Sequence, residues 1–211
     1  PALQGELWLV GCEALLSAGD VAAGAPLVDD LERIAGEALV PWATCYRCQI
    51  IVYTDPTRLL EADERLQGAI DEFSRRKDSG GLAKAHRVRA AGRARLGRIG
   101  DAEIDLFEAL IAARQGGDQR QITAALGAAP NAALWGPSPA PKAGGRCLDV
   151  VRMQRMTTAA PSLEATSLLR SQELADNTTL QDLSTSQRDL LNRRIALLEA
   201  EILALQNQLN D

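Results

Sequence analysis

Four cysteines and a single histidine are the residues that first suggest metal or redox chemistry. Cys45 and Cys48 form a C-x-x-C pair, which binds zinc beside a second such pair or exchanges thiols inside a βαβ unit. The sequence around the pair has neither context, and Cys12, Cys147 and His86 lie at no ligand spacing from it. We therefore expect four packed thiols, with no metal and no cofactor.

The motifs that would indicate an enzyme are missing from the sequence. It contains no G-x-x-x-x-G-K-[ST] loop, no G-x-G-x-x-G, no H-E-x-x-H and no G-x-S-x-G. Adjacent carboxylates such as Asp29 and Asp30, or Asp63 and Glu64, lie in expected helices. Neighbours on a helix diverge by about 100° and cannot face one substrate together. The sequence predicts a non-catalytic protein.

A local basic patch lies within this acidic chain and is the best candidate for a binding surface. Nine of the 23 basic residues fall between Arg75 and Arg98, with Asp78 as the only acid among them. They are Arg75, Arg76, Lys77, Lys84, Arg87, Arg89, Arg93, Arg95 and Arg98. On the expected helix 80–97, Lys84, Arg87 and Arg95 share one stripe and Arg98 extends it, while Arg89 and Arg93 point elsewhere.

Two interpretations of this stripe remain open. The guanidinium and ammonium groups could clamp the carboxylates of an acidic peptide or protein. Alternatively, the stripe is a solvated helix face that the acidic helix from Glu61 to Glu72 neutralises. Nucleic acid is not an expected partner, because the net charge is −5 and no aromatic residues for base stacking accompany the patch.

The composition favours helices and a protein of the cytoplasm. Alanine and leucine supply most of the 46% apolar residues, aromatic residues amount to only 3%, and strand-forming runs are few. No apolar stretch approaches the ~18 residues of a membrane span, and the N-terminus has no secretory pattern. We expect a cytoplasmic protein without membrane contact. Because the chain opens on Pro1, we also expect it to be a fragment or a processed product.

A trio of small or apolar residues at offsets 0, 4 and 7 recurs along the chain and marks one face of a helix. The four copies are Gly24, Val28 and Leu31, then Ala62, Leu66 and Ala69, then Ala102, Leu106 and Ala109, and a weaker set of Ala143, Cys147 and Val150. Their anchors are 38, 40 and 41 residues apart. Two of the trios begin five residues after Gly19 and Gly97. This period predicts stacked helical hairpins.

Proline and glycine positions place the expected helices. Pro26, Pro41, Pro56, Pro139 and Pro161 are taken as helix starts. We expect helices near 3–18, 26–39, 41–53, 57–77, 80–97, 101–115, 118–128, 140–155, 162–175 and 179–210. Trp8, Trp42 and Trp135 are expected to pack in the core or between hairpins.

The trio after a hairpin glycine resembles the tetratricopeptide repeat. The stretches RLLEADERLQGAIDEF, GLAKAHRVRAAGRARLGRIGDAE and NAALWGPSPAPKAGGRC are similar to the helical-repeat region of large bacterial ATPase and cyclase-type signalling regulators, over roughly residues 1–170. Arg89 and Arg93 stand where the family usually has a leucine and an aromatic residue, and the spacing exceeds the usual ~34 residues. The resemblance implies a sensory or partner-binding role in a bacterial signalling assembly. It also implies that the first helix of each hairpin lines a concave groove, so that the basic stripe would face a partner.

The C-terminal residues 177–211 carry a heptad seam. Leu191, Ile195, Leu198, Ile202, Leu205 and Leu209 alternate steps of four and three. Isoleucine at two of the three a positions with leucine at d favours a parallel two-stranded coiled coil. The alternative is a single amphipathic helix that caps the end of the repeat array.

The sequence therefore predicts an all-α protein with a tetratricopeptide-like antiparallel helical-hairpin solenoid at residues 1–170, followed by a coiled-coil oligomerisation helix at 177–211. Its predicted function is a non-catalytic protein interaction scaffold that self-associates through that helix. Two alternatives are a purely structural oligomer-forming protein and the regulatory fragment of a larger nucleotide-dependent enzyme.

Overall fold

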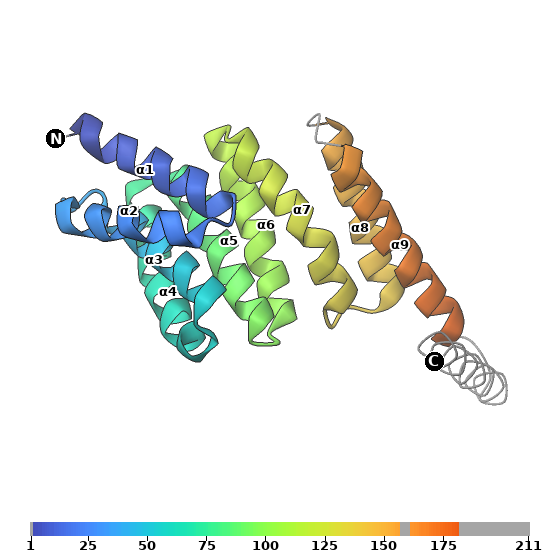
Figure 1. The fold of residues 1–211 in the computed structure, drawn as a ribbon. Coiled ribbons are helices and arrows are strands. Elements are labelled where there is room, and N and C mark those ends of the chain that lie inside the picture. Colours follow the sequence, from blue (N-terminus) through green and yellow to red (C-terminus); the bar gives the residue numbers. More distant parts are fainter. Residues whose placement is uncertain (1, 157–160, 182–211) are drawn as a thin grey trace, which may run out of the picture.

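The computed structural model describes residues 2–156 and 161–181, and every regular element within them is helical. The elements are α1 (Ala2–Ser17), α2 (Val21–Ile34), α3 (Val40–Thr54), the short 3₁₀ turn η1 (Pro56–Arg58), α4 (Leu59–Arg76), α5 (Ser79–Arg95), α6 (Ile99–Gly116), α7 (Gln119–Trp135), α8 (Ala140–Met156) and α9 (Pro161–Gln181). The expected all-α class is confirmed for the described residues (Figure 1).

The helices follow one another across the molecule in chain order (Figure 1). Each helix contacts the next one along the chain, and α1 contacts α3, α3 contacts α5, α5 contacts α7, and α7 contacts α9. The odd-numbered helices thus share one side of the array, which we call the odd-helix face. A groove between two neighbouring helices on this face is therefore lined by residues that lie far apart in the sequence.

The four recurring trios all lie on the even-numbered helices α2, α4, α6 and α8. All twelve residues are buried. Small side chains at these positions let neighbouring helices approach toward the short end of the usual ~8–10 Å range. The sequence period therefore identified the buried face of four helices.

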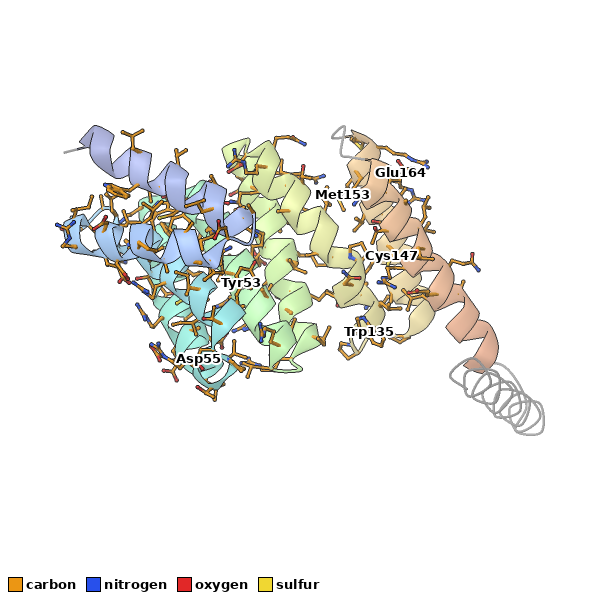
Figure 2. All side chains as sticks on the ribbon, in the orientation of Figure 1. Tyr53, Asp55, Trp135, Cys147, Met153 and Glu164 are labelled. Atoms are coloured by element: carbon orange, nitrogen blue, oxygen red, sulfur yellow. The ribbon has the colours of Figure 1, made fainter. Side chains whose placement is uncertain are left out.

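Aromatic side chains join α3 to α4 in the N-terminal half of the core. The ring of Trp42 lies 5.3 Å from that of Phe73, edge to face, and 6.3 Å from that of Tyr46, stacked. Trp8 also packs against the neighbouring cluster. The prediction for Trp135 was wrong, because this side chain is 71% exposed. It is the last residue of α7, and the turn at Gly136 leaves its indole at the surface (Figure 2).

Four of the turns between helices share a left-handed residue, and three of these also share an aspartate cap. Gly19, Lys77, Gly97 and Gly117 have left-handed backbone conformations between consecutive helices, a geometry that glycine adopts most easily. After three of these turns an aspartate caps the next helix: Asp20, Asp78 and Asp118 accept a hydrogen bond from the backbone N–H three residues on. These caps explain why α2, α5 and α7 begin where they do.

Three of the expected helices have other boundaries in the structure. Helix α2 starts at Val21 under the Asp20 cap, contains Pro26 and ends at Ile34 instead of near residue 39. Helix α7 continues through Pro130 to Trp135. Helix α9 runs to Gln181, so the expected limits at 170 and 177 both fall within one helix. The six predicted oligomerisation residues, Leu191, Ile195, Leu198, Ile202, Leu205 and Leu209, lie outside the described residues.

Candidate functional site

A groove on the odd-helix face, between α5 and α7, has the features of a partner-binding site. It encloses a cavity of about 340 Å³. Its lining is mainly alanine: Ala90, Ala91 and Ala94 from α5, Ala102 from α6, and Ala124, Ala128 and Ala132 from α7. Alanine leaves helix backbones accessible, so another helix can approach closely. We call this cavity the alanine groove.

Two exposed aromatic side chains and one arginine line the alanine groove. Tyr53 at the end of α3 is 45% exposed, and Trp135 at the end of α7 is 71% exposed (Figure 2). Tryptophan, tyrosine and arginine are the residues that most often dominate binding energy at protein interfaces. The third is Arg87, whose Nε donates to Oε1 of Gln121 at 2.9 Å.

Two further cavities lie beside the alanine groove. One, of about 330 Å³, contains Arg98 and shares Ile99 and Trp135 with the groove. The other, of about 450 Å³, is formed by α1, α3 and α7 and is lined by Glu13, Tyr46 and Gln121 among others. We call this last one the Glu13 cavity. Arg87 links it to the alanine groove through the bond to Gln121.

The structure brings Lys84 and Arg87 together with an acidic residue that was not predicted. Lys84 is 0% exposed, and its Nζ donates to Glu13 Oε2 at 2.6 Å. The same ammonium lies 4.7 Å from the centre of the Tyr46 ring, a cation–π contact. Arg87 Nη2 lies 3.6 Å from Glu13 Oε1. Lys84 is therefore buried rather than exposed on the helix surface.

Burial changes the ionisation of this pair. It lowers the pKa of Lys84 to about 8, the charge of Arg87 acts in the same direction, and Glu13 partly opposes both. For Glu13, burial favours the neutral acid, but the charge and hydrogen bond of Lys84, with help from Ser17 and Arg87, leave its pKa below the ordinary value. Glu13 is thus an anion held by two cations of α5.

The other two residues of the predicted stripe are Arg95, the last residue of α5, and Arg98, which lies directly before α6. Arg95 is exposed and donates to the backbone carbonyl of Tyr53 at 3.5 Å. Arg98 bonds to Asp101 at 2.8 Å and to Asp63 at 3.2 Å. Of the four predicted residues, Arg87 lines the alanine groove and Arg98 lines the cavity beside it, whereas Lys84 and Arg95 line none of the three cavities. Each of the four already has an acceptor within the protein.

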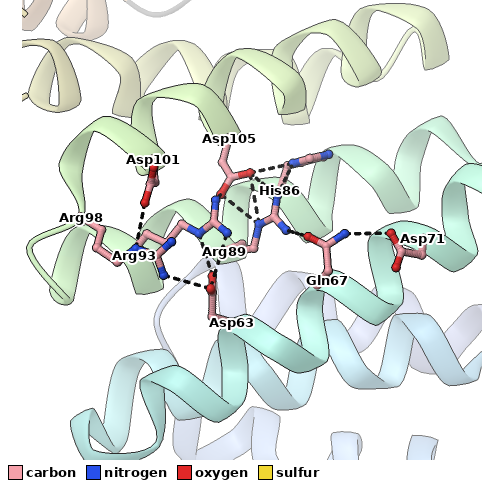
Figure 3. A network of polar contacts seen from close by, with 9 residues as sticks. All are labelled: Asp63, Gln67, Asp71, His86, Arg89, Arg93, Arg98, Asp101 and Asp105. Atoms are coloured by element: carbon pink, nitrogen blue, oxygen red, sulfur yellow. Dashed lines mark hydrogen bonds and ion pairs between the residues drawn. The ribbon is translucent and has the colours of Figure 1, made fainter.

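Arg89 and Arg93 belong to a second polar cluster, which the sequence did not reveal (Figure 3). Asp105 of α6 is buried and accepts from Arg89 Nη2 at 2.6 Å and from Arg93 Nη1 at 3.0 Å. Its Oδ1 also lies 2.9 Å from Nδ1 of His86. Arg93 continues to Asp63 of α4 at 2.7 Å. The cluster therefore ties α4, α5 and α6 together.

The carboxyl of Asp105 is an anion despite its burial. Burial alone would raise its pKa, but hydrogen bonds from His86 and Arg89 and the charges of Arg89 and Arg93 outweigh that cost and lower the pKa. None of the cavities described above is lined by Asp105, Arg89 or Arg93. This arrangement is suited to fixing helix orientation rather than to binding a ligand.

The four cysteines are buried thiols. Burial raises the pKa of Cys48 to about 11, which leaves little thiolate for metal binding or thiol exchange near neutral pH. Among the described residues, no group of three or more histidine, cysteine, aspartate or glutamate side chains is placed to hold a metal ion.

Sequence patterns did not predict Glu13, Gln121 or the burial of Lys84, although weak signals exist for Glu13 and for the burial of Lys84. Glu13 is one of only two charged residues in the apolar helix ALQGELWLVGCEALLS, and a carboxylate in such a setting needs a partner. Lys84 stands between Ala83 and Ala85, which are both buried. Gln121 of α7 has no comparable signal, because its role depends on how α5 and α7 pack.

None of the helices in the described part of the chain combines the length and apolar character required to cross a bilayer. No curated protein and no solved structure matches the chain. One family model does, over residues 140–211, which comprise α8, α9 and the residues that follow. These residues, with the heptad seam among them, are similar to the mechanosensitive ion channel porin domain.

Proposed function

We propose that the protein is a non-catalytic helical-repeat scaffold that binds an acidic amphipathic helix of a partner protein in the alanine groove. The observation that carries the proposal is the groove itself, a small-residue floor flanked by Tyr53, Trp135 and Arg87. Helical partners commonly dock their apolar face into grooves of this kind. Arg87 lines the groove, Arg95 bonds to the backbone of Tyr53 beside it, and Arg98 lines the adjoining cavity. Their charges are complementary to acidic residues on the partner.

The repeat architecture supports this proposal. The trios on four even-numbered helices, the contacts between successive odd-numbered helices and the repeated aspartate caps all suit a tetratricopeptide-like solenoid. In such an array the first helix of each hairpin, here an odd-numbered one, faces the partner. A bacterial signalling or regulatory assembly in the cytoplasm is the setting that we propose for it.

The binding test uses a fluorescent peptide helix with leucine on one face and glutamate on the other. We expect Arg87→Glu together with Arg95→Glu to weaken binding at least tenfold, because close charge pairs at interfaces contribute about 1.5 kcal/mol or more. The matched control is Arg33→Glu on α2, where the arginine side chain is 72% exposed and distant in sequence from the groove. Fluorescence anisotropy gives the Kd. Equal affinity of the double variant and the control would remove the groove from the proposal.

Self-association through the C-terminal seam is the second part of the proposal. We expect the whole chain to be a dimer or larger by light scattering, and a chain ending at Gln181 to be a monomer. The cut is placed after Gln181, so every described helix is kept. If both chains have the monomer mass, the seam does not drive assembly.

The similarity of residues 140–211 to the mechanosensitive ion channel porin domain favours a second candidate function, in a channel-associated assembly. The test is chemical crosslinking in cells that produce the whole chain or the chain ending at Gln181, with crosslinked partners identified by mass spectrometry. Crosslinks to a channel subunit that require residues 182–211 would favour this candidate over a signalling role.

A further inference from the structure

Glu13 of α1 is the anion that pairs with Lys84 and Arg87, in a site whose other parts come from other helices. Lys84 and Arg87 come from α5, Tyr46 from α3 and Gln121 from α7. Helix α1 packs mainly against α2 and α3. Its carboxylate nevertheless reaches the α5 cations, 71 residues away in sequence for Lys84. The cationic part of the site is therefore assembled without α1, which supplies only the negative charge.

The cavity lies on the solvent side of this carboxylate. Glu13 lines the Glu13 cavity, whereas Lys84 is fully buried and is not part of its wall. Besides the two cations, Ser17 Oγ donates to Glu13 Oε1 at 2.9 Å. A buried ammonium needs an anion at this position, since an unpaired charge away from water is costly. Any anion that approached from the cavity would have to replace Glu13.

We infer that Lys84 and Arg87 form a carboxylate-binding site and that Glu13 is its internal occupant, which a glutamate or aspartate of the partner displaces. The partner's part in this inference rests on the proposed function. The α1 helix then acts as an autoinhibitory cover: binding requires its carboxylate to leave. Specificity for a carboxylate follows from the two adjacent cations and from the small space that Glu13 occupies.

The site can be tested without any partner, by filling the space left in Glu13→Ala with a small carboxylate. We expect sodium acetate to raise the melting temperature of Glu13→Ala by about 3 °C more than sodium chloride at equal ionic strength, since a ligand bound only by the folded state stabilises it. The wild-type protein should respond equally to both salts. The control is Glu13→Ala with Lys84→Met, which removes the buried cation and should abolish the acetate effect.

The second test measures binding of the fluorescent leucine and glutamate peptide helix. The peptide should bind Glu13→Ala at least fivefold more tightly than the wild type, because the internal competitor is gone. An acetate effect no larger than that of chloride overturns the carboxylate site, whether or not the peptide binds. An acetate effect without peptide binding rejects the proposed function and supports the site. If Glu13→Ala does not fold, Glu13→Ser, which keeps a hydroxyl near Lys84, takes its place in the same measurements.

Discussion

Replacing Asp105 with alanine is expected to lower the free energy of unfolding by about 3–5 kcal/mol, because it leaves two arginines near a buried position without their shared anion. Arg89 is buried and loses all three of its hydrogen bonds to the carboxylate. Arg93 keeps Asp63 and is affected less. Urea unfolding followed by circular dichroism measures the change.

Asp101 provides the matched control for this prediction. It lies on the same helix, α6, and pairs with Arg98, but its side chain is 45% exposed. Exposed ion pairs contribute about 0–1 kcal/mol, so Asp101→Ala should fall in that range. A double replacement, Arg89→Met with Asp105→Leu, removes both members of the buried pair and should recover most of the loss. Equal effects of Asp105→Ala and Asp101→Ala would refute the account of a buried charge.

The acid dependence of stability follows from the same site. The folded pKa of Asp105 lies below its unfolded value, so its ionisation stabilises the fold above the unfolded pKa of about 3.9. That contribution is lost as the pH falls through the folded pKa. Asp105→Asn should therefore show a smaller loss of stability than the wild type as the pH falls below the unfolded value.

The difference between the two polar clusters shows what the sequence could and could not predict. Helical periodicity placed Arg89 and Arg93 on a different side of α5 from Lys84 and Arg87, and this separation is correct. Their partners could not be predicted, because Asp105 meets Arg89 only through the rotation of α6 against α5. No spacing within one helix encodes that rotation.

The burial of Lys84 also could not be predicted from the sequence. The position of Lys84 on a stripe with Arg87 predicted a surface cation, but its side chain is buried, paired with Glu13 of α1 and placed over the Tyr46 ring of α3. Both contacts come from helices that are distant from Lys84 in the sequence. The presence of a basic stripe could be predicted, whereas its accessibility depends on tertiary packing.

The recurring trio is the feature that sequence periodicity predicted best, and Leu66→Ala tests it directly. Leu66, the middle residue of the second trio, is 1% exposed on α4, and Leu60 on the same helix is 63% exposed. Leucine to alanine changes helix propensity alike at both positions, so the difference between the variants isolates burial. We expect Leu66→Ala to cost about 2–5 kcal/mol and Leu60→Ala no more than about 0.5 kcal/mol.

If the trios are repeats, the middle leucine of the next trio should be as costly to replace as Leu66. Leu106 is 6% exposed and occupies the same position on α6. If the trios are equivalent elements of one continuous core, Leu106→Ala should destabilise the protein in the same range as Leu66→Ala, in a single cooperative unfolding transition. Only a shared packing role makes the two middle leucines equally costly to remove. If Leu106→Ala lowered the free energy of unfolding as little as Leu60→Ala, the shared spacing would reflect helix periodicity alone.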